Sequence, residues 1–175
     1  MKKNVFLMTF IALAGLLATG TAYYFTRSNV LYSAAITFGT IFYHFAMRLA
    51  VGYTIDSKFH NRMDYTKRWF RERSFEQALY KKIKVKKWKK LIPSFNPQDF
   101  RLDRHSAEEI VQVMCQSEIV HEIIMPLSFI PVIFSIWFGS SGVFVITSCL
   151  AFLFDGVCVI LQRYNRPRLM RLIKK

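Results

Sequence analysis

Four apolar runs constrain this chain more than any other feature of its sequence. They cover residues 5–25, 30–51, 119–138 and 143–161. A helix needs about 20 apolar residues to cross the hydrocarbon core of a bilayer, where its backbone groups must pair within the helix. The sequence therefore predicts an all-α integral membrane protein with four transmembrane helices. We expect a single membrane domain over residues 1–175.

Basic residues are unevenly distributed around these runs, and the net charge is +14. Two lie at the N-terminus, fifteen between Lys58 and Arg104, and six from Arg163 onward, whereas Arg27 stands alone between the first two runs. The positive-inside rule predicts that both termini and the segment 52–117 are cytoplasmic. We expect a multi-pass protein of the cell (plasma) membrane. Because the aromatic residues are concentrated in the spans, nucleic acid is not an expected partner.

The segment 52–117 is too polar to cross a membrane. Its aromatic and aliphatic residues are spaced among lysines and arginines, which predicts one or two amphipathic interfacial helices on the inner leaflet. Pro93 and Pro97 should end this helical stretch. The sequence Ser-Ala-Glu-Glu from Ser106 matches a capping box and predicts that a new helix begins there.

Cysteines and histidines offer little support for a metal or a disulfide. The three cysteines are Cys115, Cys149 and Cys158, an odd number without a Cys-x-x-Cys pair. We expect them to pack as small apolar residues. No resident metal or cofactor is expected.

Glu118 and His121 are three residues apart, so a helix would place them on one face. They lie where the chain enters the third apolar run. Such a pair can form a general base that deprotonates a hydroxyl. It can also supply two metal ligands, or form an interfacial ion-pair cluster with Glu122.

Asp155 is the one acidic residue in the fourth run. A carboxylate inside a membrane is costly and marks a candidate functional site. Its expected partners are His44, Arg48 or the arginines that follow it at the end of the run. A structural polar clamp between helices would also account for it.

Two basic stretches complete the candidate site. Residues 81–90, KKIKVKKWKK, are typical of a leaflet anchor, although they would also suit docking of an anionic cofactor or a carrier protein. Residues 162–169, QRYNRPRL, place three arginines where the last helix should reach water. Arginine forks bind phosphate or carboxylate at two points.

At these residues the chain resembles the glycosyl-carotenoid acyltransferase (glycosyl-4,4'-diaponeurosporenoate acyltransferase) family of Gram-positive bacteria. Residues 162–169 are similar to that family's final motif, and Glu118 and His121 match its Glu-x-x-His. Its middle motif is matched by Glu76, Tyr80, Ile83, Lys86, Trp88, Lys89 and Pro93. Departures are Gln116, where the family typically has arginine, Val113, near which it has an acidic residue, and Asp155, where it tends to have asparagine.

The resemblance implies a membrane enzyme that moves a fatty acyl chain onto a hydroxyl of a lipid-like acceptor, either a sugar hydroxyl or another one. His121 would take the hydroxyl proton, Glu118 would orient it, and Arg163, Arg166 and Arg168 would form an anion-binding wall. The expected substrate-binding residues are Glu76, Tyr80, Trp88, Lys89, Asp155, Gln162, Arg163, Tyr164, Asn165, Arg166 and Arg168. Membrane lipids are expected partners, and acyl-CoA, an acyl carrier protein or a phospholipid would be the donor.

Two other functions fit parts of the sequence. A non-catalytic lipid-binding or assembly protein would need the basic charge but not these particular residues. A small metal-dependent redox protein would use Glu118, His121 and His44. Four spans make a thin bundle, which is compatible with a homodimer.

Overall fold

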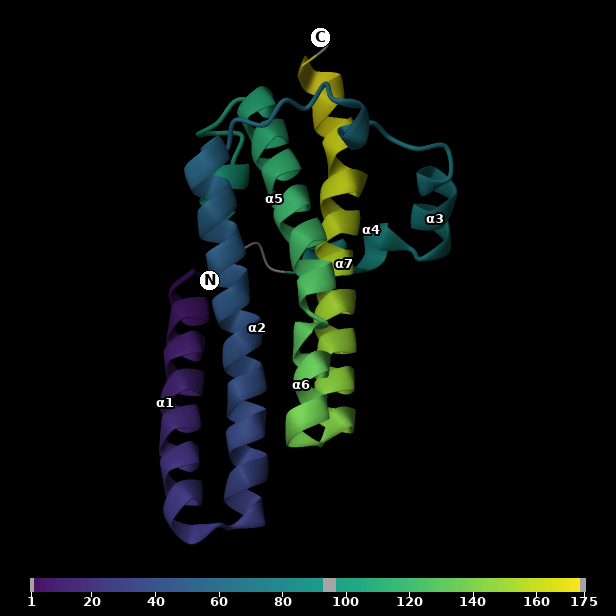
Figure 1. Ribbon diagram of the computed structural model, residues 1–175. Coiled ribbons are helices and arrows are strands. Elements are labelled where there is room, and N and C mark those ends of the chain that lie inside the picture. The colour runs from purple at the N-terminus through teal and green to yellow at the C-terminus, as the bar shows by residue number, and fades with distance from the viewer. Residues whose placement is uncertain (1, 93–96, 174–175) are drawn as a thin grey trace. The chain divides into compact units, whose positions relative to one another are not determined.

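The computed structural model describes residues 2–92 and 97–173. Every regular element among these residues is a helix (Figure 1). The α-helices are α1 (Lys2–Thr26), α2 (Asn29–Phe59), α3 (Glu76–Lys82), α4 (Val85–Trp88), α5 (Ala107–Leu127), α6 (Ile130–Phe138) and α7 (Ser141–Ile173). Short 3₁₀ helices occupy Arg68–Phe70, Lys89–Leu91 and Pro97–Phe100.

Four helical segments are long and apolar enough to cross a membrane, which confirms the predicted class. They are Lys3–Thr26, Asn29–Phe59, Ala107–Phe138 and Ser141–Ile173. At 1.5 Å per residue α2 and α7 are each about 45–50 Å long, whereas the hydrocarbon core of a bilayer is about 30 Å thick. Both helices therefore continue beyond the apolar runs, and α7 contains the whole arginine-rich stretch 162–169.

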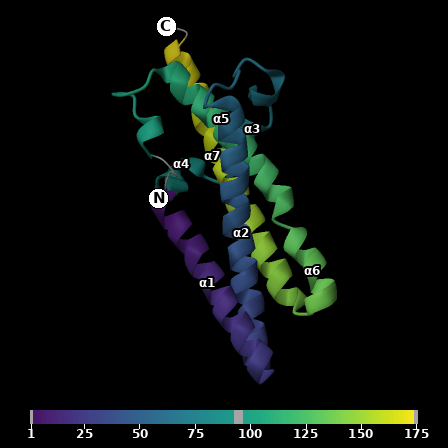
Figure 2. The same ribbon diagram turned by 60° about the vertical axis from the view of Figure 1, so that its left-hand side comes forward.

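The chain divides into two compact units, which we describe separately. The first comprises Met1–Gly52 and Ile123–Phe154. Within it α1 and α2 run side by side as a hairpin in both views (Figures 1 and 2). Gly15 makes this approach possible, because a Cβ atom there would lie 2.6 Å from the Phe38 ring.

Two prolines explain why the third span is divided into α5 and α6. Pro126 lies in the last turn of α5, and Pro131 lies at the start of α6. Proline has no backbone N–H, so Pro131 cannot donate to the carbonyl of Leu127 four residues earlier. The Tyr43 hydroxyl of α2 donates to that carbonyl instead, at 2.8 Å. A side chain from another helix thus compensates for the missing helical bond.

The second unit comprises Tyr53–Glu122 and Asp155–Lys175. Its hydrophobic core is built from Met63, Phe70, Val111 and Cys115. The helix α5 begins at the predicted capping box: the Ser106 amide donates to Glu109 at 2.8 Å, and the Glu109 amide donates to the Ser106 hydroxyl at 3.2 Å.

The basic segment folds into shorter pieces than one long amphipathic helix would. Lys84, with φ of 54°, separates α3 from α4. One face of these helices is buried through Glu76, Tyr80 and Val85. Pro97 begins a 3₁₀ helix, and Pro93 lies outside the described residues.

Gly15→Ala should destabilise the α1–α2 hairpin by about 1–3 kcal/mol, because the new methyl group would displace the Phe38 ring. Thermal unfolding of the purified protein in detergent measures the change. Gly20→Ala is the matched control in the same helix, since a Cβ there would meet no atom within 4 Å beyond its own stretch of helix. Equal stability of the two variants would show that Gly15 is not needed for close packing.

Candidate functional site: a buried ionic network beside a His–Asp pair

The centre of the second unit is a carboxylate held between two arginines. Glu118 of α5 is fully buried, and Arg166 of α7 is 2% exposed. Arg163 Nη1 donates to Glu118 Oε1 at 2.5 Å, and Arg166 Nη1 donates to Glu118 Oε2. One helical turn separates Arg163 from Arg166, so a single face of α7 presents both guanidinium groups to one carboxylate.

A second carboxylate completes the charge balance. Glu76, at the start of α3, accepts bonds to Oε1 from Arg163 Nε at 2.8 Å and Nη2 at 2.5 Å. Its other oxygen accepts from the Tyr80 hydroxyl at 2.9 Å. Burial and the Glu76 carboxylate raise the pKa of Tyr80 above its ordinary value. Tyr80 therefore remains a protonated donor at neutral pH. The bonds from Arg163 tie the first turn of α3 to α7.

The remaining guanidinium donors hold a loop. Arg163 donates to the carbonyls of Trp69 at 3.2 Å and Arg71 at 3.1 Å. Arg166 donates to the carbonyl of Phe70 at 2.7 Å. Three consecutive carbonyl groups are thus directed at two buried cations. Sequence reasoning missed this role, because any residue type supplies a carbonyl.

His121 pairs with Asp155 across α5 and α7. Its Nδ1 lies 2.8 Å from Asp155 Oδ1; the Asp155 side chain is fully buried, and that of His121 is 22% exposed. Cys158, one turn beyond Asp155, is a further neighbour of the imidazole. Glu118, the partner expected for His121 from sequence, instead contacts the arginines. The Glu-x-x-His spacing therefore serves two separate interactions.

The other residues of 162–169 make contacts around this network. Arg168 stacks on the Tyr164 ring, with 3.6 Å from its guanidinium carbon to the ring centroid. Lys89 donates to the Asn165 side chain at 3.0 Å. Gln162 donates to the Ser117 hydroxyl at 3.1 Å. The Lys89–Asn165 contact brings the middle motif next to the stretch 162–169.

Trp88 of the middle motif makes a local contact. Its indole N–H donates to the carbonyl of Ile83, five residues earlier, at 2.8 Å. The Tyr80 and Tyr164 rings meet edge to face, with centroids 5.4 Å apart. Tyr80 therefore contacts α7 through the Tyr164 ring. Trp88 instead stabilises the turn between α3 and α4.

A pocket of about 190 Å³ opens beside the network. It combines carboxylates, arginines and apolar side chains. Its lining residues are Arg73, Phe75, Glu76, Leu79, Tyr80, Glu122, Ile160 and Arg163. Glu122, which the sequence places beside the possible Glu118–His121 ion pair, accepts a hydrogen bond at Oε2 from the Trp69 indole at 2.8 Å. Among the described residues, no group of three or more His, Cys, Asp or Glu side chains is arranged to hold a metal ion.

Glu118→Gln should lower the free energy of unfolding by about 3–5 kcal/mol, because it leaves two buried arginines with one missing counter-charge. Thermal unfolding in detergent measures the loss. Glu108→Gln, an exposed position on the same helix, is the matched control and should change stability by less than about 0.5 kcal/mol. A Glu118→Gln protein as stable as this control would contradict the central role of the buried carboxylate.

Comparison with known proteins supports the resemblance seen in the sequence. No curated protein and no solved structure matches this chain. One family model, described as glycosyl-4,4'-diaponeurosporenoate acyltransferase, matches residues 66–175, which is more than half of the chain. The match contains Glu76, His121, Asp155 and the stretch 162–169. The chain therefore belongs to the glycosyl-4,4'-diaponeurosporenoate acyltransferase family, a family of acyltransferases.

Proposed function

We propose that this protein is an integral membrane acyltransferase that moves a fatty acyl chain onto a hydroxyl of a lipid-like, glycosylated acceptor. The observation that carries the proposal is the pairing of a partly exposed imidazole, His121, with the buried carboxylate of Asp155. Acyl transfer to a hydroxyl needs a group that removes the hydroxyl proton, and an oriented imidazole is the most common one.

The proposed reaction uses the two nitrogens of His121 differently. Nδ1–H donates to Asp155, which fixes the tautomer and leaves Nε2 to accept the proton of the acceptor hydroxyl. The hydroxyl oxygen then attacks the acyl carbonyl of the donor, and an ester bond forms as the bond to the donor's leaving group breaks. The imidazolium returns its proton to the leaving group. Asp155 is thus a positioning residue that also stabilises the transient positive charge.

The buried arginines have a different role in this proposal from an anion-binding wall. The donors of Arg163 and Arg166 point at Glu76, Glu118 and three backbone carbonyls. We assign them to positioning α3, α5 and the loop 69–71 around the pocket. Arg168, which is exposed, is the arginine of 162–169 that we keep as a substrate-facing cation.

The acceptor class follows from the family and from the pocket. The family's described activity is directed at a glycosylated carotenoid. We propose an acceptor of the same general chemistry, with a polar hydroxyl-bearing head and an apolar body. The Glu122 carboxylate and the Arg73 guanidinium suit hydroxyl groups, and Phe75, Leu79 and Ile160 suit the apolar part. Donors compatible with this reaction are acyl-CoA, an acyl carrier protein or a phospholipid.

We further propose that the protein lies in the cell membrane with both termini and residues 52–117 on the cytoplasmic side. The support is the concentration of basic residues in those parts of the chain. The interfacial helices that the sequence predicts for residues 52–117 correspond in this proposal to α3 and α4. Their exposed lysines would face anionic headgroups.

Cysteine labelling should test this orientation. In a protein whose native cysteines are replaced by serine, Ser74→Cys should react with a membrane-impermeant maleimide only after cells are permeabilised. Ser28→Cys, between α1 and α2, should react in intact cells. The reverse pattern would overturn the orientation.

His121→Ala should lower acyl transfer by about 10²–10⁴-fold while the protein still inserts and folds. Asp155→Ala should also reduce kcat. Asp155→Asn should restore much of it, because the amide oxygen still accepts from Nδ1–H. The exposed His60 provides the control. Its backbone is in the left-handed region, which asparagine adopts readily, so the His60→Asn protein should be fully active. Activity is measured as acylated lipid by mass spectrometry of membranes, and undiminished turnover in His121→Ala would refute the assignment.

A further inference from the structure

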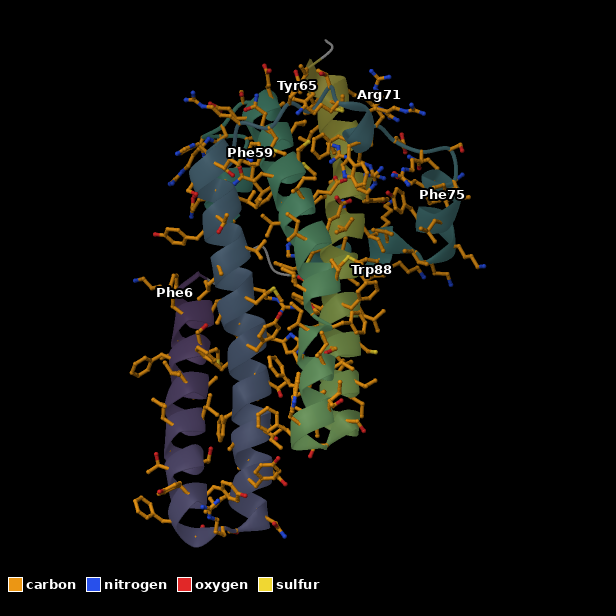
Figure 3. The ribbon with its side chains drawn as sticks, in the orientation of Figure 1. Phe6, Phe59, Tyr65, Arg71, Phe75 and Trp88 are labelled. Atoms are coloured by element: carbon orange, nitrogen blue, oxygen red, sulfur yellow. The ribbon has the colours of Figure 1, made fainter. Side chains whose placement is uncertain are left out.

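An arginine-rich pocket lies on the loop that the buried network holds. It has a volume of about 530 Å³ and is lined by Arg68, Trp69, Arg71, Glu72 and Arg73. All five residues are exposed. Arg71 and Phe75 are labelled in Figure 3, on the segment that leads into α3. Neither the Glu-x-x-His motif nor the stretch 162–169 contributes to this pocket.

The lining of this pocket carries a net positive charge, with three arginines against one carboxylate. Within the described ranges, none of the three arginine side chains forms an ion pair, and Arg73 lies over the Trp69 ring at 5.9 Å. The one carboxylate of the lining, Glu72, accepts a hydrogen bond from Gln77. Three guanidinium groups are therefore available to a ligand at one place.

The backbone of this loop is held in position from inside. The carbonyls of Trp69, Phe70 and Arg71 all accept bonds from Arg163 and Arg166. A loop fixed in this way loses little conformational entropy when a ligand binds to its side chains. The buried arginines thus support a surface of further arginines that the ligand can reach.

We infer that the Arg68–Arg71–Arg73 pocket binds the phosphate group of the acyl donor. Guanidinium forks bind phosphate oxygens in pairs, and several forks around one group give both affinity and orientation. The inference rests on the proposed acyl transfer, because it assigns the pocket to the donor of that reaction. The phosphate can belong to a soluble phosphopantetheine thioester or to a phospholipid headgroup.

The position of the pocket suits a donor. Arg73 lines both this pocket and the smaller one that contains Glu76 and Tyr80. Trp69 of the larger pocket donates to Glu122 of the smaller one. A donor whose phosphate occupies the larger pocket can therefore extend its acyl group toward the residues that we assign to the acceptor.

Binding measurements test the inference without requiring turnover. The full-length protein, in a phosphate-free maltoside detergent, is titrated with coenzyme A in one arm and with short-chain phosphatidylglycerol in the other. Tryptophan fluorescence, to which Trp69 of the pocket contributes, or calorimetry reports binding. The triple variant Arg68→Gln/Arg71→Gln/Arg73→Gln should raise the Kd of one probe by about tenfold for each arginine lost. The probe affected identifies a soluble or a lipid phosphate.

Two comparison variants make the result specific. Lys58→Gln/Arg62→Gln/Arg104→Gln removes the same charge from exposed positions outside the pocket and should change Kd little. Arg→Lys at the three pocket positions keeps the charge but removes the forks, so an intermediate Kd is expected. If the triple glutamine variant is unstable, the three single glutamine variants give the same comparison.

Two results would overturn the inference: neither probe binding the wild-type protein, or equal weakening by the pocket variant and its charge-matched control. The His121→Ala protein should bind the probe like wild type. This measurement keeps the two proposals separate. If the His121→Ala protein still transferred acyl groups, the proposed mechanism would be refuted, but phosphate binding at the arginine pocket would not be.

Discussion

The second unit depends on one buried carboxylate, Glu118, placed between Arg163 and Arg166. Charged groups removed from water are tolerated only when each is paired and hydrogen-bonded. Glu118 and Glu76 supply two negative charges for the two guanidinium groups, and backbone carbonyls satisfy the remaining donors. The same interaction joins α5, α7, α3 and the loop before α3. Loss of any member would leave an uncompensated charge in the interior.

This network separates two tasks that share the same sequence motifs. The stretch 162–169 contains the arginines that build the scaffold, whereas the chemistry that we propose belongs to His121 and Asp155. The scaffold determines the position of α5 against α7, and therefore the distance between the imidazole and its carboxylate. Arginine suits the scaffold because its planar fork can address two carboxylates and several carbonyls at once. The charge of Arg163 and Arg166 is used inside the protein, and the ligand-binding role that we propose belongs to the exposed arginines of the loop.

Much of the fold could be predicted because it follows from local rules. Apolar length predicted the four spans, and the Ser106–Glu109 pattern predicted the start of α5. The helix ends were less predictable: α2 and α7 continue into polar sequence because tertiary contacts stabilise them there. The division between α5 and α6 at Pro126 and Pro131 was missed, although proline is its visible cause. For the site, the sequence pairs Glu118 with His121. In the structure Glu118 binds Arg163 and Arg166, and His121 binds Asp155.

The sequence by itself determined that this is a helical membrane protein and the family to which it belongs. Hydropathy and motif identity are properties of short segments, so they can be read without a fold. Only the tertiary structure decided the partners. Two side chains three residues apart on α5 meet positions on α7 that are eight residues apart, Asp155 and Arg163. That register between antiparallel helices is set by packing across the interface, which no single segment encodes.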